Sequence, residues 1–98
     1  MVGRSQGGSI GVLGFSGSGA PPAPTANTGV YGYAPGVGVR GVATNGRGGV
    51  FSGPTAQLRL VPSTAATHPA SGTAGDLFMD KSNRLWLCKG TTSWVQLA

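Results

Sequence analysis

Few side chains of this 98-residue chain could perform acid–base, nucleophilic or metal chemistry. Its carboxylates are Asp76 and Asp80, its only imidazole is His68 and its only thiol is Cys88. The two carboxylates flank one short predicted strand and so lie about 13 Å apart, too far to share a substrate bond. We expect them to cap turns instead. His68 and Cys88 lack a third, orienting group, and no spacing fits a metal site. The sequence predicts no catalytic residue, metal or cofactor, and the chain is not expected to be an enzyme.

Two further patterns carry little functional weight. Gly36, Gly38 and Gly41 have the GxGxxG spacing of a dinucleotide site, but no helix can begin after them, as that site requires. Seven Lys and Arg against two Asp and Glu give a net charge of +5. These cations never form a run, so we expect solvated surface charges and no nucleic-acid partner.

Aromatic side chains are the remaining candidates for binding. Exposed rings of Tyr31, Tyr33, Trp86 and Trp94 could stack on sugars and contact a glycan or receptor. Alternatively, Trp86 and Trp94 form the core of a trimeric cap. Both interpretations are open at this stage.

A short repeat organises the first half of the chain. Four aligned copies of this repeat contain the Gly-Val pairs that begin at Gly11, Gly29, Gly38 and Gly49, and such short spacings are typical of a solenoid or β-helix. The constant β-branched positions are predicted to line a crowded axis, and these are Val12, Val30, Val39 and Val50. The next residue varies and is expected to face outward. A glycine then follows in the first three copies, where a bend or the close approach of another backbone would exclude a larger side chain.

This composition favours association of identical chains. With 19 Gly, 7 Pro and few large apolar residues, one chain would struggle to offset the entropy lost on folding. We therefore expect an all-β, obligate homotrimer with an intertwined β-helical shaft over 1–62. A strand containing Leu58 and Leu60 is predicted to end the shaft at Pro62. Residues 63–74 are expected to be an extended linker in which His68 is exposed.

The last segment, 75–98, is predicted to be a small antiparallel β-meander cap. Its strands are expected at 76–80, 85–89 and 94–97, separated by turn-forming residues. Strand alternation places one apolar set on one face and another on the opposite face: Leu77, Met79, Leu85, Leu87, Val95 and Leu97 on the first, Phe78, Trp86, Cys88 and Trp94 on the second. Because a meander of this size buries only one face on itself, the other must meet a subunit, the shaft or a ligand.

The segments "TGVYGYA", "VGVRGVA" and "GGVFSG" resemble the Gly-Val-Xaa-Gly repeats of phage tail-fibre and tail-spike shafts and of bacterial surface proteins. The segment "AQLRLVPS" and the tail "GDLFMDKSNRLWLCKGTTSWVQLA" look like a C-terminal module that accompanies such repeats. This resemblance implies a glycine-rich structural protein, a trimeric fibre or stalk whose cap presents a receptor-binding tip. The alternative is a carbohydrate-binding or adhesin module that uses the cap aromatics. Either function implies a virion or a cell-surface location, and the sequence shows neither a signal peptide nor a membrane span.

Overall fold

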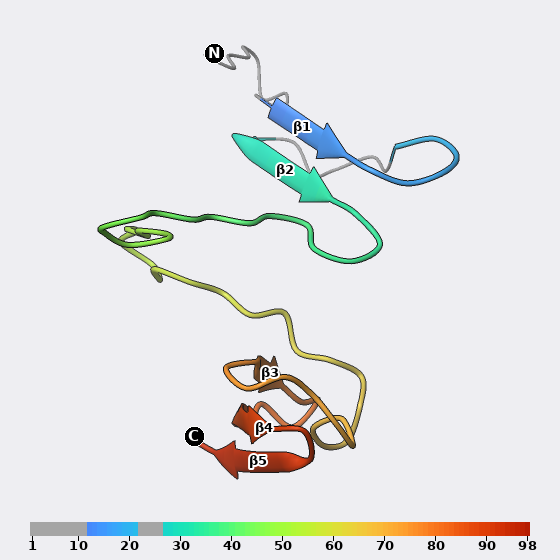
Figure 1. Ribbon diagram of the computed structural model, residues 1–98, viewed down its shortest axis with the longest axis vertical. Helices are drawn as coiled ribbons and strands as arrows, with labels where there is room; N and C mark the ends of the chain where they lie inside the picture. The colour runs from blue at the N-terminus through green and yellow to red at the C-terminus, as the bar shows by residue number, and fades with distance from the viewer. Residues whose placement is uncertain (1–11, 22–26) are drawn as a thin grey trace. The chain divides into compact units, whose positions relative to one another are not determined.

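The computed structural model describes residues 12–21 and 27–98 (Figure 1). Expectations that concern residues 1–11 and 22–26, including the start of the first repeat at Gly11, lie outside these ranges. The chain divides into two compact units, Met1–Val50 and Phe51–Ala98. The described residues form five strands and no helix: β1 (Val12–Phe15), β2 (Val30–Tyr33), β3 (Leu77–Met79), β4 (Leu85–Gly90) and β5 (Ser93–Gln96). The predicted all-β class is confirmed for this part of the chain. No helix in it could cross a membrane.

The first unit pairs two copies of the repeat within one chain. Strands β1 and β2 are parallel, and Val12 lies opposite Val30 and Gly14 opposite Gly32 (Figure 1). Beyond the glycines, the rings of Phe15 and Tyr33 stack with centroids 5.8 Å apart and planes 8° apart. Each repeat position therefore lies beside the equivalent position of the next copy.

Two glycines of the repeat are sites of close backbone approach. A Cβ on Gly32 would lie 2.5 Å from Cγ2 of Val39 and against the carbonyl oxygen of Gly38. A Cβ on Gly41 would likewise meet the carbonyl oxygen of Gly48. The predicted need for glycine is confirmed at both positions, although the approaching backbone belongs to the same chain. The third and fourth copies form no strands, so the described residues hold one parallel strand pair and no solenoid.

The strand predicted around Leu58 and Leu60 does not form, and that prediction is wrong. Residues 51–61 contain no strand, and Leu58 is exposed. Alternation of apolar and polar residues is only half of what a strand requires, because its backbone groups also need a neighbouring strand to complete the hydrogen-bonded ladder. No described segment of the chain pairs with these residues.

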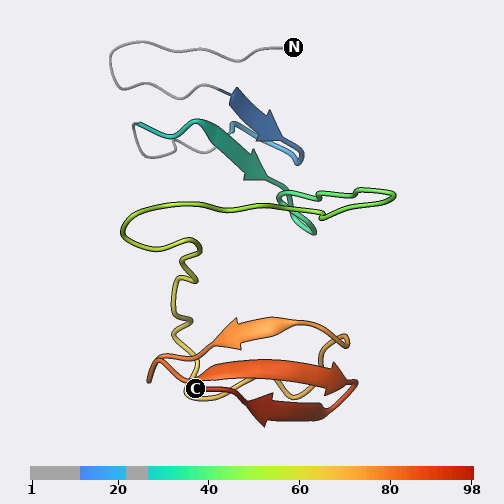
Figure 2. The ribbon, with the colours of Figure 1, turned by 90° about the vertical axis from the view of Figure 1, so that its left-hand side faces the viewer.

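The second unit contains the predicted three-stranded antiparallel sheet, with strand order β3-β4-β5 (Figure 2). Leu77 lies opposite Leu87, and Leu87 lies opposite Val95. The pairing of β4 with β5 shifts between Cys88 and Gly90, which marks a bulge before the turn into β5. Asn83, in the turn between β3 and β4, has a positive φ of 63°, a conformation that asparagine tolerates better than most residues.

The predicted linker, residues 63–74, lies in the same unit as the sheet and is hydrogen-bonded to it. Ser63 N–H donates to the carbonyl oxygen of Met79 over 2.9 Å, and Lys81 N–H donates to that of Ala65 over 3.0 Å. Near the other end of the segment, Gly72 forms an isolated antiparallel bridge to Thr91. These bonds fix the segment against the sheet at both ends, and we call residues 63–74 the strap.

Candidate functional site

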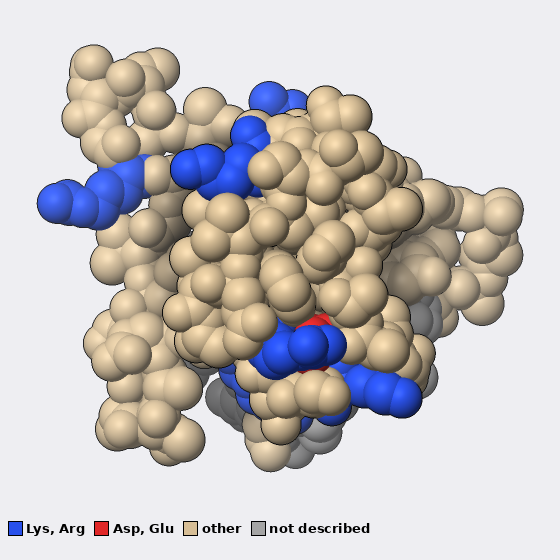
Figure 3. All heavy atoms as spheres, turned by 90° about the horizontal axis from the view of Figure 1, so that it is seen from below, with Lys and Arg blue, Asp and Glu red and all other residues tan. Residues whose placement is uncertain are grey.

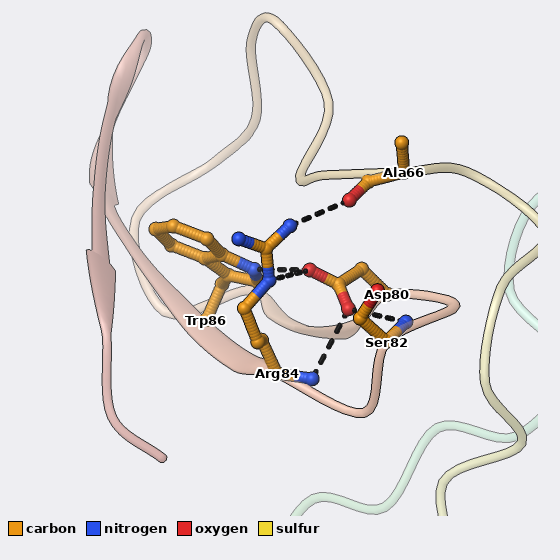
Figure 4. Close-up of polar contacts among 5 residues, drawn as sticks. All are labelled: Ala66, Asp80, Ser82, Arg84 and Trp86. Atoms are coloured by element: carbon orange, nitrogen blue, oxygen red, sulfur yellow. Dashed lines mark hydrogen bonds and ion pairs between the residues drawn. The ribbon is translucent and has the colours of Figure 1, made fainter.

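Asp80 is the polar centre of the second unit. It directly follows β3, and its carboxylate is fully buried. Oδ1 accepts hydrogen bonds from the backbone N–H groups of Ser82 at 2.9 Å and Arg84 at 3.1 Å. Oδ2 accepts from Nε of Arg84 at 2.7 Å and from Nε1 of Trp86 at 3.0 Å (Figure 4). The predicted turn-capping role of this carboxylate is confirmed, because it closes the turn between β3 and β4.

The same hydrogen bonds set the charge of Asp80. Burial by itself raises the pKa of this carboxyl, but the hydrogen bonds from Trp86, Arg84 and Ser82 favour the charged form more strongly and lower the pKa from 3.8 to about 2. Asp80 is therefore a carboxylate at neutral pH. Such a group accepts hydrogen bonds and has no proton to donate.

Arg84 connects this carboxylate to the strap. While Nε is paired with Asp80, Nη2 donates a 2.6 Å hydrogen bond to the carbonyl oxygen of Ala66. The guanidinium also lies over the ring of Trp86, 5.6 Å from its centroid. One side chain thus holds the β3–β4 turn, the strap and an indole ring together. In the view of Figure 3, the acidic atoms that are visible lie beside basic side chains.

His68 lies between the two tryptophans, and the prediction that it is exposed is wrong. Its ring is half-buried, 4.6 Å from that of Trp86 in an edge-on contact and 5.2 Å from that of Trp94 in a stacked contact. Its Nδ1 donates a 2.6 Å hydrogen bond to the carbonyl oxygen of Pro69. No sequence pattern indicates these contacts, because the strap must first fold back onto the sheet before His68 can reach the rings.

Trp94 is packed closely by its own chain. Phe78 contacts its ring edge-on at 6.3 Å, and a Cβ on Gly72 would lie 2.7 Å from its Cζ2 atom. Its Nε1 is buried and has no hydrogen-bond partner among the residues that the structure describes. Cys88, also next to Gly72, is a free and buried thiol. This side of the sheet is therefore the packed interior of the unit, and it contains all four residues that strand alternation placed together: Phe78, Trp86, Cys88 and Trp94.

The opposite side of the sheet carries six aliphatic residues in two rows of three. The first row is Leu77, Leu87 and Val95, and the second is Met79, Leu85 and Leu97. We call these six residues the aliphatic face. Leu77, Val95 and Leu97 are 44% to 52% exposed, and Met79, Leu85 and Leu87 are half-buried.

Three of the four valines predicted to line the trimer axis are exposed in the first unit. Val12 is half-buried in β1, whereas Val30, Val39 and Val50 are 69% to 79% exposed. Of the predicted ligand contacts in this unit, Tyr31 is half-buried, and Tyr33 is exposed beside Phe15. No group of three or more His, Cys, Asp or Glu within residues 12–21 and 27–98 could hold a metal ion.

Comparisons of the chain with protein-family models, with curated proteins and with solved structures found no match. The class that the structure defines is a two-unit all-β chain, with a parallel pair of repeat strands in the first unit and a strapped antiparallel sheet in the second.

Proposed function

We propose that this chain is a structural segment of a homotrimeric fibre or stalk. The repeats would form the shaft, and the second unit would be a cap that sets the register of the three chains and presents a receptor-binding tip. The observation that carries the proposal is the parallel register of β1 and β2, which places one repeat directly beside the next, Val12 against Val30 and Gly14 against Gly32. A stack of this kind can be extended by adding further copies.

The exposed valines support association through the repeats. Val30, Val39 and Val50 occupy the same position in their copies and remain 69% to 79% exposed in the single chain. Full burial of a valine side chain stabilises a structure by about 1.5 kcal/mol or more. A trimer axis that collects this position from three chains would bury all of them at once.

A trimeric rod would act by avidity. Three weak tip sites on one rigid stalk bind a repetitive surface, such as cell-surface glycans, more tightly than one site does. A location on a virion or a cell surface belongs to the same proposal. The alternative of a sugar-binding platform on the cap has less support, since His68 and Arg84 already lie on the rings of Trp94 and Trp86.

The mass of the full chain in solution tests the proposal. Light scattering coupled to size exclusion should give three times the 9.7 kDa of the chain, independent of dilution across the micromolar range. A 9.7 kDa species under these conditions would contradict it.

A matched pair of valine variants tests the role of the repeat. Val50 and Val61 are exposed to similar extents, 79% and 75%, but only Val50 occupies the repeat position. We expect Val50→Asp to weaken or dissociate the trimer and Val61→Asp to leave its mass unchanged. Equal behaviour of the two variants would argue against a valine-lined axis.

A further inference from the structure

The aliphatic face is the side of the sheet that the described residues of the second unit leave uncovered. The opposite side, which carries Phe78, Trp86, Cys88 and Trp94, is called the aromatic side. The strap reaches it at His68 and Gly72, and Cys88 is buried there. On the aliphatic side, Leu77 and Leu97 remain about half exposed. The two rows form a compact patch, because neighbouring strands place Leu87 between Leu77 and Val95, and Leu85 between Met79 and Leu97.

A unit as small as Phe51–Ala98 needs stabilisation beyond its own core. Small domains commonly obtain it from disulfides, from a structural metal or from oligomerisation. The chain has a single cysteine, so it cannot form a disulfide within itself. The described residues contain no cluster that could hold a metal. Association through the uncovered side of the sheet would supply such stability.

The chemistry of the face points to another copy of the same face. None of its six side chains carries a charge or a hydrogen-bonding group; alternation along β4 places Lys89 on the same side, but at the bulge, beyond the end of the rows. The best complement to such a patch is an equally uncharged patch. The first unit independently leaves Val30, Val39 and Val50 exposed. Further copies of the same chain could cover both the aliphatic face and these three valines.

We propose that the aliphatic face is the trimer contact of the C-terminal unit, with the faces of three copies packed around a common axis and the aromatic side turned outward. This inference rests on the proposed homotrimer and adds which surface forms the contact. It also assigns different roles to the two apolar sides of the sheet. The aromatic side forms the interior of each unit, and the aliphatic face forms the contact between chains.

Adjacent residues on opposite sides of the last strand provide a local test. Leu97 belongs to the aliphatic face, whereas alternation places Gln96 on the aromatic side, and both are exposed in the single chain. Leu97→Cys and Gln96→Cys would be made separately in the full chain and oxidised at low concentration with copper(II)-phenanthroline. Since disulfides form only between Cβ atoms about 4 Å apart, Leu97→Cys should give cross-linked pairs of chains on non-reducing gels. We expect no cross-linked pairs from Gln96→Cys or from the unmodified chain, in which Cys88 is buried.

A charge on the face provides a second measurement. We expect Val95→Glu to shift the mass of the chain toward monomer or to abolish the cross-link of Leu97→Cys, while Gln96→Glu does neither. The indole N–H signal of Trp86, held by Asp80, reports in the NMR spectrum whether each variant is folded. If Val95→Glu fails to fold, Leu97→Glu takes its place with the mass of the chain as its readout, because Leu97 lies beyond the end of β5.

The outcomes separate this inference from the proposed function. A trimer that neither cross-links through Leu97→Cys nor responds to a charge on the face would overturn the inference and leave the fibre proposal intact. Cross-linking that is equal for Leu97→Cys and Gln96→Cys would also overturn it. A wild-type chain that is monomeric would overturn both.

Discussion

The indole Nε1 of Trp86 donates a 3.0 Å hydrogen bond to Oδ2 of Asp80 and so joins the aromatic side of the sheet to the turn between β3 and β4. The same oxygen also pairs with Arg84, which reaches the strap at Ala66. Three segments of the second unit are thus fixed by one carboxylate. This arrangement makes Asp80 the most informative position for testing the fold.

Replacing Asp80 by Asn should destabilise the second unit. In asparagine, an amide NH2 group replaces one carboxylate oxygen. This donor would face N–H groups that are themselves donors, and those N–H groups would lose their hydrogen-bond acceptor. We expect the melting temperature to fall by on the order of 10 °C, measured by circular dichroism. The matched control is Asp76→Asn, because Asp76 is exposed and its carboxylate accepts one hydrogen bond, from Thr73 N–H. Equal losses in the two variants would contradict the central role of Asp80.

The pKa of Asp80 predicts how stability depends on pH. Its folded-state pKa of about 2 is below the ordinary value of 3.8, so folding favours the charged form. The contribution is fully present above about pH 4 and is lost as the pH falls from 3.8 through 2. The free energy of unfolding of the wild type, measured with a denaturant, should therefore fall as the pH decreases through that window. Asp80→Asn should show a smaller change there, and parallel profiles for the two proteins would refute the assignment.

Removing the ring of His68 should lower the stability of the second unit and expose the tryptophan rings to solvent. It contacts both Trp86 and Trp94, and contacts between ring pairs contribute about 0.5 to 1.5 kcal/mol each, so His68→Ala should cost about 1 to 2 kcal/mol. Tryptophan emission should also shift to the red and be quenched more strongly by acrylamide. His68→Phe retains a planar ring and serves as the control. Unchanged quenching in His68→Ala would show that the histidine does not cover the rings.

Two glycines of the first unit differ in the space around them. A Cβ on Gly32 would clash with Gly38 and Val39, whereas one on Gly36 would meet nothing within 4 Å. Gly32→Ala should therefore destabilise the first unit by about 1 to 3 kcal/mol, the usual cost of overpacking. Gly36→Ala should be tolerated. Hydrogen exchange of the β1 and β2 amides measures the effect locally, and similar exchange in both variants would contradict the close approach.

Strand alternation accounts for the parts of the second unit that were predicted correctly. The strands β3, β4 and β5 and the division of their residues between two sides follow from the two-residue period of a strand and from the turn formers between the strands. Alternation failed at Leu58 and Leu60, where the pattern is equally regular but no partner strand is present. It could not predict His68, whose contacts depend on the path of the strap.

The sequence by itself determined the all-β class, the three strands of the sheet, the turn-capping role of Asp80 and the need for glycine at Gly32 and Gly41. The strands and the turn depend on local backbone geometry, which neighbouring residues dictate, whereas the two glycines were indicated by their recurrence in the repeat. Only the tertiary structure decided which copies of the repeat pair, which side of the sheet the strap covers, and that Arg84 and His68 lie on the tryptophan rings. Apart from the contact of Arg84 with Trp86, which lies two residues away, those contacts join residues distant in the sequence, and their energies arise only once the chain has folded back on itself.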